Sequence, residues 1–384
     1  MMASRTMWVN GPIIVGAGPA GIAAAACLHT RGVPSVVLDR DDCLASLWQR
    51  RTYDRLRLHL PKHFCQLPGM PFPDHYPVRR LRPLRPRRRP LAGPSLRPRH
   101  QGHHGYIRRW LVVATGENAE RVIPDLDGAD SFKGPVTHVS EYKSGEPYKG
   151  KRVLVVGCGN SGMEVCLDLC DHGARPSMVV RDGVHVLPRE MLGVATFSVA
   201  VFLLRFLPLR VVDRLLVLLA GLFLGGDLAR LGLRRPSHGG PLELKNSKGR
   251  TPVLDIGALE KIRAGDIKIV PGVKRLEAGG AELVDGRFVA ADAVILATGY
   301  HSNVPQWLKR LLQWRGYPKV DFPEGWKGES GLYSVGFTRR GLAGLSLDAV
   351  RVAGDIAAEY HTTSPSIVPQ PTQLVPSSQS QAET

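Results

Sequence analysis

The chain has 384 residues, enough for two packed domains, and its 43% apolar and 22% charged residues are ordinary for a globular protein. The formal net charge of +17 suggests a nucleic-acid or anionic membrane partner, but eleven arginines fall between Val78 and Arg109, so most of the excess charge is local. The six cysteines form no CxxC pair, and the first residues contain no apolar signal segment. Both observations argue against a secreted protein held together by disulfides. We expect reduced thiols and a cytoplasmic location.

The first predicted unit is a strand, a glycine-rich turn and a helix, "PIIVGAGPAGIAAAACL". In such a turn the first glycine permits the bend, the second lets the backbone approach a pyrophosphate, and the third lets the helix pack on the strand. The next strand, "SVVLDR", ends at Asp39, whose carboxylate can accept hydrogen bonds from a ribose diol. The pattern predicts a nucleotide with a free ribose, bound by Gly16, Ala17, Gly18, Pro19, Ala20, Gly21 and Asp39.

An arginine- and proline-rich block follows at 78–105, and it cannot easily form a helix or a packed strand. Two explanations stay open. The block is a basic arm for nucleic acid or anionic lipid, or it is a segment read out of frame or mis-spliced. Since it lacks the interleaved aromatic side chains that stack on bases, we expect no nucleic-acid partner.

Two segments, "WLVVATGEN" from Trp110 and "AVILATGYHSNVP" from Ala293, each predict a buried strand that ends in Ala-Thr-Gly. We expect both strands to return the chain to the first domain after an excursion. A final stretch, "GLYSVGFTRRGLAGLSLDAVRVAGDIA", predicts a strand, a glycine turn and a helix that complete that domain.

A second unit repeats the first design in "RVLVVGCGNSGMEVCLDLC". Its second strand, "SMVVR", ends at Arg181 in nearly the register of Asp39 but with the opposite charge. A guanidinium can pair with the 2′-phosphate of NADP, which a carboxylate would repel. This site should take NADPH, and the residues expected to bind it are Gly157, Cys158, Gly159, Asn160, Ser161, Gly162 and Arg181.

An apolar stretch at 194–226 is interrupted by charged residues and a proline, so it falls short of the roughly 20 consecutive apolar residues of a membrane span. It predicts instead a pair of buried helices that wall a ligand cavity. A contact with a membrane surface, such as that of the endoplasmic reticulum, stays open for this stretch.

Together these elements predict an α/β fold with two Rossmann-like dinucleotide-binding domains. The FAD domain comprises 8–125 and 290–360, the NADPH domain 130–289 is inserted in it, and 361–384 forms a disordered tail. Two such domains suit a protein that passes electrons from NADPH to a tightly held FAD. A disulfide reductase shares this architecture but needs a redox cysteine pair, which the sequence lacks, and the sequence predicts no metal site.

The stretch "FKGPVTHVSEY", Phe132 to Tyr142, fits FxGxxxHxxxY and lies just before the second glycine turn. With both glycine turns and both Ala-Thr-Gly segments, it makes the chain resemble the flavin-containing monooxygenases. Stretches such as "VVRDGVHVLPREMLG" and "LELKNSKGRTPVLDIGALEKI" resemble their plant YUCCA branch, the indole-3-pyruvate monooxygenases of auxin synthesis. The resemblance covers most of 11–77 and 106–359. We expect His138 of the motif to be structural rather than an acid–base catalyst.

The resemblance implies an enzyme that converts indole-3-pyruvate to indole-3-acetate with NADPH, FAD and O2, through a C4a-(hydro)peroxyflavin. The flavin carries this chemistry, so no catalytic side chain is required. Segments that match the family add Leu47, Trp48, Leu58 and His59 to the residues expected near the flavin. His59 is a candidate for orienting the flavin or its oxygen adduct, with the alternative that it caps a turn.

The block at 78–105 departs from the family, which has an acidic and aromatic stretch, a helix and several strands of the FAD domain in its place. Missing strands beside the flavin would weaken FAD binding or admit water. The alternative function is therefore a catalytically impaired homologue that still binds nucleotide. The sequence leaves the oligomeric state open.

Overall fold

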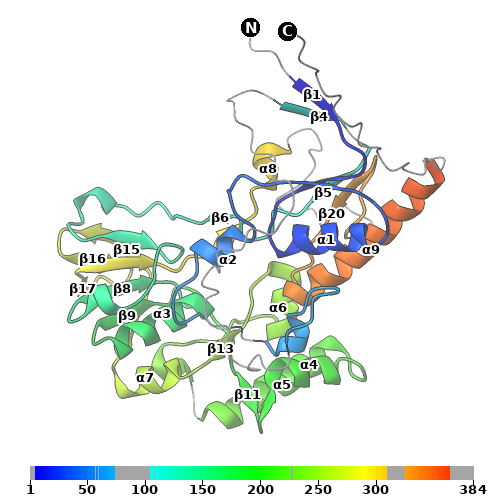
Figure 1. The fold of residues 1–384 in the computed structure, drawn as a ribbon. Helices are drawn as coiled ribbons and strands as arrows, with labels where there is room; N and C mark the ends of the chain where they lie inside the picture. Colours follow the sequence, from blue (N-terminus) through cyan, green and yellow to red (C-terminus); the bar gives the residue numbers. More distant parts are fainter. Residues whose placement is uncertain are drawn as a thin grey trace, which may run out of the picture.

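The structure is a computed structural model that describes residues 5–56, 58, 60–73, 104–107, 109–225, 228–308 and 325–363. His59 and almost all of the arginine-rich block lie outside these residues. Figure 1 shows two α/β units side by side, with a group of helices below them.

The first unit holds four parallel strands in the order β20-β5-β2-β3. Their bounds are Ile13–Val15 for β2, Val36–Leu38 for β3, Leu111–Val113 for β5 and Leu332–Ser334 for β20. Helix α1 (Pro19–His29) is rich in alanine, and its small side chains let it pack closely on the C-terminal helix α9 (Gly341–Thr363) (Figure 1). Ile14, Val112 and Tyr333 are buried in the core that these helices and the sheet form.

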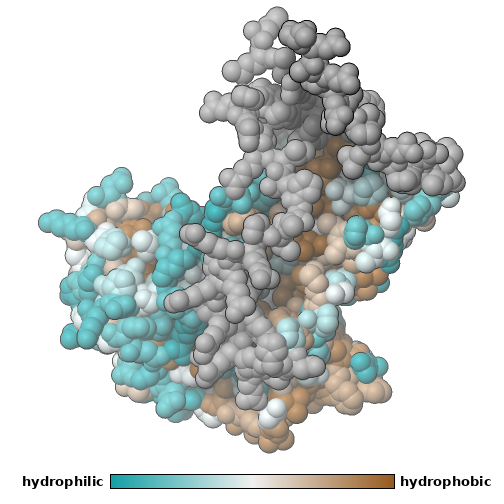
Figure 2. Space-filling model, in the orientation of Figure 1, coloured by the Kyte–Doolittle hydropathy of each residue, from teal (hydrophilic) through white to brown (hydrophobic). Residues whose placement is uncertain are grey.

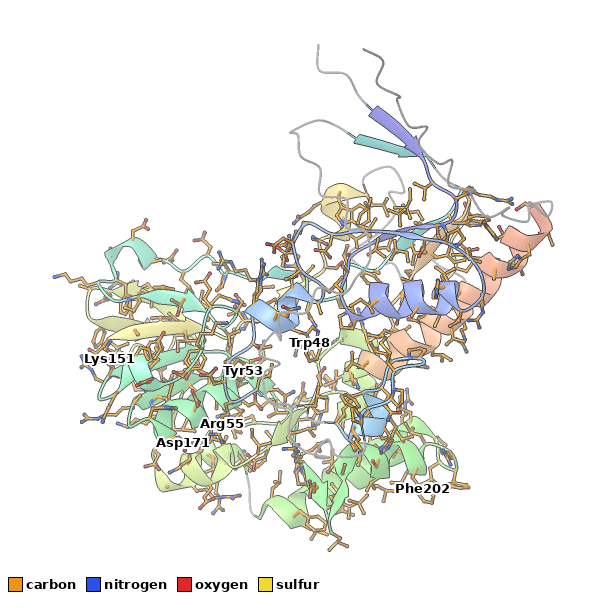
Figure 3. All side chains as sticks on the ribbon, viewed as in Figure 1. Trp48, Tyr53, Arg55, Lys151, Asp171 and Phe202 are labelled. Atoms are coloured by element: carbon orange, nitrogen blue, oxygen red, sulfur yellow. The ribbon has the colours of Figure 1, made fainter. Side chains whose placement is uncertain are left out.

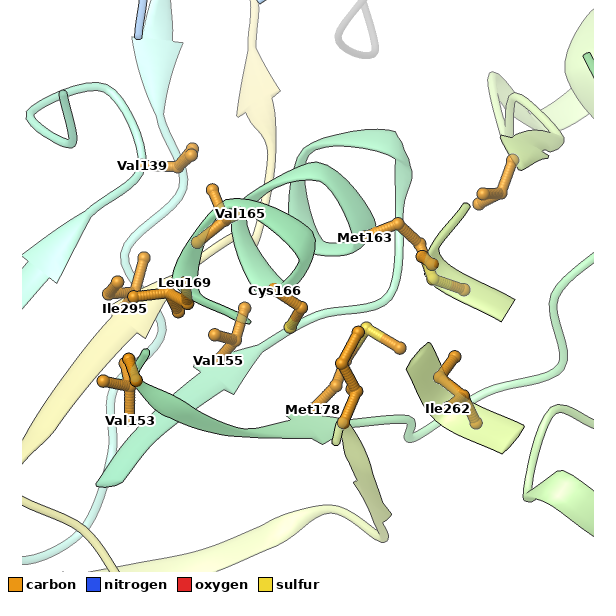
Figure 4. Close-up of a cluster of buried hydrophobic side chains, with 14 of the residues drawn as sticks. Val139, Val153, Val155, Met163, Val165, Cys166, Leu169, Met178, Ile262 and Ile295 are labelled. Atoms are coloured by element: carbon orange, nitrogen blue, oxygen red, sulfur yellow. The ribbon is translucent and has the colours of Figure 1, made fainter. Parts of the chain in front are cut away.

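The second unit holds five parallel strands in the order β14-β9-β8-β18-β7. Their bounds are Val136–His138 for β7, Arg152–Val156 for β8, Arg175–Val179 for β9, Lys268–Val270 for β14 and Ala293–Leu296 for β18. Helices α3 (Asn160–Asp171) and α7 (Ala258–Ala264) cover one face, where Val155, Leu169 and Ile295 are buried (Figure 4). The other face packs on an antiparallel sheet of β15 (Val273–Glu277), β16 (Gly280–Leu283) and β17 (Phe288–Ala290).

The placement of strand β18 corrects the sequence prediction. The sequence assigns Ala293–Leu296 to the first domain, but β18 pairs in parallel with β8 and β7 of the second unit. The local pattern could not show this, because "VVATG" and "ILATG" look alike and sheet membership depends on long-range pairing. The predicted tail also begins too early, since α9 continues to Thr363; residues 364–384 lie outside the described part of the chain.

Between β9 and β14 the chain builds a helical layer. Its helices are α4 (Thr196–Leu203), α5 (Leu209–Leu224) and α6 (Pro241–Lys248), and its short strands are β10 (Val186–Pro188), β11 (Glu190–Met191), β12 (Val194–Ala195) and β13 (Val253–Asp255). The buried Asp213 of α5 accepts hydrogen bonds from the backbone N–H groups of Leu242 and Glu243, at 2.8 and 3.0 Å. It therefore caps the N-terminus of α6 and joins the two helices.

Short elements complete the connections. Strand β1 (Arg5–Trp8) pairs with β4 (His104–Ile107), β6 (Glu120–Arg121) pairs with β19 (Tyr300–His301), and α2 (Ser46–Arg50) and α8 (Val304–Trp307) are single turns. After α2, the buried Tyr53 donates a hydrogen bond to the buried Glu164 of α3, and Arg55 pairs with Asp171 of the same helix (Figure 3). This segment ties the first unit to the second.

The outer faces of α4 and α5 are apolar and exposed. Phe202, Leu218 and Leu222 are 58%, 62% and 72% exposed, and Figure 2 shows a brown patch at the lower edge of the molecule, where these helices lie. The stretch predicted as two buried helices is therefore buried only on its inner side. Within the described ranges, no helix is long and apolar enough to cross a membrane.

Candidate active site

The first glycine turn is crowded except at its middle glycine. A methyl group on Gly16, whose φ is +109°, would overlap the carbonyl oxygen of Ala114, and one on Gly21 would overlap the carbonyl oxygen of Gly16. A methyl group on Gly18 would meet nothing within 4 Å. The backbone at Gly18 therefore faces open space, which is the arrangement that lets a pyrophosphate approach.

The second glycine turn repeats this geometry. A methyl group on Gly157, whose φ is +118°, would overlap the carbonyl oxygen of Ala297, and one on Gly162 would overlap that of Gly157. Gly159, like Gly18, has nothing within 4 Å of such a methyl group. In both units the carbonyl that contacts the first glycine belongs to the alanine of an Ala-Thr-Gly segment. The two segments therefore pack against the glycine turn in the same way, each in its own sheet.

Each turn leads into a helix whose N-terminus has no side-chain cap. Helix α1 begins after Gly18 and α3 begins after Gly159, and neither cap residue has a side chain to satisfy the first N–H groups. These N–H groups and the positive end of the helix dipole form an anion site. Both turns have the donors and the space that a dinucleotide pyrophosphate requires.

The two side chains expected to read the ribose differ in how firmly they are held. The carboxylate of Asp39 accepts the backbone N–H groups of Ala17 and Asp41, so it is fixed beside the first turn. The guanidinium of Arg181 is 81% exposed and donates to Asp182 at 3.1 and 3.2 Å. Asp39 therefore lies beside the first turn and in the cavity wall, whereas Arg181 lies in solvent, two residues after the end of β9.

A cavity of about 1060 Å³ lies between the first unit and the helical layer. The predicted residues that line it are Gly16, Gly18, Pro19, Ala20, Asp39, Leu47, Trp48, Leu58 and Asn160. The predicted residues that do not line it are Ala17, Gly21, Gly157, Cys158, Gly159, Ser161, Gly162 and Arg181. The first turn therefore opens into this cavity, while the second turn reaches it only through Asn160.

Asn160 also connects the second turn to the helical layer. Its Oδ1 accepts a hydrogen bond from the N–H of Leu254 at 2.9 Å, and its Nδ2 donates to the carbonyl of Pro252 at 3.3 Å. Both partners lie at β13, directly after α6, and both line the cavity. One asparagine therefore sets the position of the cavity wall relative to the second glycine turn.

The far end of the cavity is apolar and aromatic. Phe197 and Ala200 of α4 and Leu216 of α5 line it, and the ring of Phe64 packs edge-on against Phe197 at 5.0 Å between centres. The sequence predicted a cavity wall from 194–226, and these residues come from that stretch. The sequence did not predict that Lys245 lines the cavity, because "LELKNSKGR" has the composition of an exposed helix.

The FxGxxxHxxxY motif has a structural role in the part of the chain that the structure describes. His138 Nε2 lies 3.2 Å from the carbonyl oxygen of Gly299, and its Nδ1 accepts the N–H of Ser140 at 3.2 Å. Burial lowers the pKa of His138, which keeps the ring neutral in this arrangement. Tyr142 donates to the buried Asp168 at 2.6 Å. The motif therefore fixes the start of the second unit and is not part of the cavity wall.

Comparison with known proteins places this geometry in a family. Residues 108–315 match the family model described as flavin-binding monooxygenase-like, and residues 12–51 match an FAD binding domain. The chain is 55% identical over 380 residues to the probable indole-3-pyruvate monooxygenase YUCCA9 of Arabidopsis thaliana, covering 92% of this chain and 90% of the relative. It is 53% identical to the indole-3-pyruvate monooxygenase YUCCA1 of Oryza sativa subsp. japonica, covering 93% of each.

The fold is also shared with solved structures. The crystal structure of the OTEMO complex with FAD and NADP superimposes with a TM-score of 0.61 and covers 94% of this chain and 87% of that chain. The sequence identity is 14%, so the likeness concerns the fold alone.

Proposed function

This chain belongs to the YUCCA branch of the flavin-containing monooxygenases, and on that basis we propose that it converts indole-3-pyruvate to indole-3-acetate with NADPH, FAD and O2. In the balanced reaction, indole-3-pyruvate, NADPH, H⁺ and O2 give indole-3-acetate, CO2, NADP⁺ and water. One oxygen atom enters the new carboxylate and the other leaves as water. The proposal is carried by two glycine turns, each open at its middle glycine, in a chain 55% identical to a relative named for this reaction.

The first turn fits FAD. Its pyrophosphate would lie against Gly18 at the N-terminus of α1, and Asp39 would accept hydrogen bonds from the ribose diol. Leu47, Trp48 and Leu58 line the same cavity and would contact the flavin nucleotide. When bound and reduced, the flavin supplies the electrons that activate O2.

The second turn fits NADPH. The pyrophosphate would lie against Gly159 at the N-terminus of α3. Arg181 is exposed and bonded only to its neighbour Asp182 among the described residues, so its guanidinium is available to pair with the 2′-phosphate. Asn160 stands between the two sites, since it belongs to the second turn and lines the cavity of the first.

The protein's own contribution to the chemistry is to position the reactants and exclude water. Trp48, Leu58, Phe197 and Leu216 line the cavity and present apolar surface to it. Apolar surface beside the flavin would limit the entry of water and, with it, the wasteful release of peroxide.

The test is an absorption spectrum of the purified protein, before and after anaerobic addition of NADPH. We expect a flavin spectrum that bleaches with NADPH and, after O2 and indole-3-pyruvate are added, the formation of indole-3-acetate. A folded, colourless protein that FAD cannot reconstitute would contradict the proposal and support the impaired homologue instead. That alternative depends on the arginine-rich block, which lies almost entirely outside the described residues.

The exposed apolar face of α4 and α5 supports a peripheral contact with a membrane surface, such as that of the endoplasmic reticulum. Phe202, Leu218 and Leu222 form this face, and Arg205 and Arg210 flank it and would favour anionic lipid. Flotation with anionic vesicles should recover the protein with the lipid. Recovery in the lipid-free fraction, for wild-type protein and for Phe202→Gln alike, would contradict this part of the proposal.

A further inference from the structure

Lys245 is a cation in an apolar part of the cavity. It lies on α6 and lines the cavity together with Phe197 and Leu216, and its Nζ atom is 5.1 Å from the centre of the Phe197 ring. Burial lowers the pKa of this ammonium group; the charge of Glu117 opposes that shift, and Arg340 adds to it. Within the described residues, Lys245 has no hydrogen bond and no ion pair with a carboxylate.

Of the other cations on the cavity wall, Arg40 and Arg339 have polar partners, Lys248 lies in solvent, and Arg51 lies in the field of Glu120. Arg40 pairs with Glu120 at 2.6 Å, and Arg51 also acts electrostatically on Glu120. Arg339 donates to two backbone carbonyl groups at the end of α6. Lys248 is exposed. An anion that enters the apolar end of the cavity beside Phe197 therefore meets Lys245, the cavity-lining cation that lies over this ring.

We propose that Lys245 binds the carboxylate of the α-keto acid substrate, while the aromatic ring of the substrate lies in the apolar end of the cavity beside Phe197. The inference rests on the proposed function and names the group that recognises the substrate. Indole-3-pyruvate has one planar ring and one carboxylate, and the cavity offers one aromatic, apolar end and one partly desolvated ammonium there. A charged hydrogen bond in such surroundings is stronger than the same bond in water.

The position of Lys245 on its helix favours the carboxylate over a dinucleotide phosphate. The pyrophosphates would lie at the N-termini of α1 and α3, where the glycine turns open. Lys245 lies in the last turn of α6, and its Nζ atom lies over the ring of Phe197 of α4. A phosphate partner for Lys245 is nevertheless a measurable outcome, and the experiment separates it from the carboxylate.

The experiment measures binding of the acid product and its neutral amide to oxidised, FAD-loaded protein by titration calorimetry. Indole-3-acetate carries the carboxylate, and indole-3-acetamide does not. We expect wild-type protein to prefer the acid, and Lys245→Met to weaken acid binding by about 10- to 100-fold while amide binding changes by less than about threefold. Lys245→Arg should keep most of the preference. Lys248→Met, three residues along the same helix, should change acid binding by less than about threefold, since Lys248 is exposed.

Each other outcome is decisive. Equal affinity of the wild-type protein for acid and amide overturns the inference without any variant, so the test survives a Lys245→Met protein that fails to fold. Equal loss of acid and amide affinity in Lys245→Met shows a packing role only. Weakened NADP⁺ binding with an unchanged preference for the acid assigns Lys245 to a phosphate. A holoenzyme that binds the acid through Lys245 but never forms it from indole-3-pyruvate contradicts the proposed function and not this contact.

Discussion

At the scale of single residues, Gly18 and Gly21 lie in one turn but should respond differently to a methyl group. In Gly21→Ala the methyl group overlaps the backbone of Gly16, so we expect the free energy of unfolding to fall by about 1–3 kcal/mol. In Gly18→Ala the methyl group enters open space, so the FAD-free protein should unfold as wild type does but bind less FAD. Urea denaturation of stripped protein and the flavin-to-protein absorbance ratio check both results. Equal destabilisation by the two substitutions would contradict the open space at Gly18.

His138 should make the stability depend on pH. Burial lowers its pKa in the folded protein below the value of about 6.5 expected when the chain is unfolded. As the pH falls through that value the unfolded chain binds more protons, so the free energy of unfolding should fall with it. Urea midpoints measured from pH 8 downward should show this loss, and His138→Gln should flatten it. Identical pH profiles for the two proteins would show that His138 titrates alike in both states.

At the scale of the elements, the cap that joins α5 to α6 should matter for the cavity wall. Asp213→Ala removes the acceptor for two N–H groups at the start of α6, so the free energy of unfolding should fall by about 1–2 kcal/mol. Asp213→Asn keeps one acceptor oxygen and should cost less. Chemical denaturation checks the order of the two variants. Because α6 carries Lys245, indole-3-acetate binding should weaken in Asp213→Ala while FAD content is retained.

The sequence predicted the elements whose chemistry is local. Both glycine turns and Asp39 could be predicted because a turn, the start of a helix and the end of a strand are each marked by a few neighbouring residues in the sequence. Strand β18 was misplaced because its pattern is the same as that of β5, and only pairing with β8 distinguishes them. Lys245 gave no signal, since its low exposure depends on α4 and α5 packing beside α6.

At the scale of the whole molecule, the described contacts that join the two units include a buried hydrogen bond and a partly exposed ion pair. Tyr53→Phe removes the phenol that donates to the buried Glu164, so it should lower the free energy of unfolding by about 1–3 kcal/mol. Arg55→Gln removes an ion pair that is partly exposed, and it should cost less than about 1 kcal/mol. Urea unfolding of both variants tests the order. A larger loss for Arg55→Gln would mean that the surface pair dominates the junction.

The matching geometry of the two glycine turns has a consequence for how such a chain can change. In each unit an alanine carbonyl lies behind the first glycine, and one side chain just after the second strand, Asp39 or Arg181, is the one we propose to contact the nucleotide. These two side chains belong to different sheets. Because the two nucleotide-binding turns are separate, a substitution in one can change its nucleotide preference without altering the other. If Arg181 binds the 2′-phosphate as proposed, a change of one codon would alter coenzyme choice at the second copy, while the flavin copy and the fold around it would stay as they are.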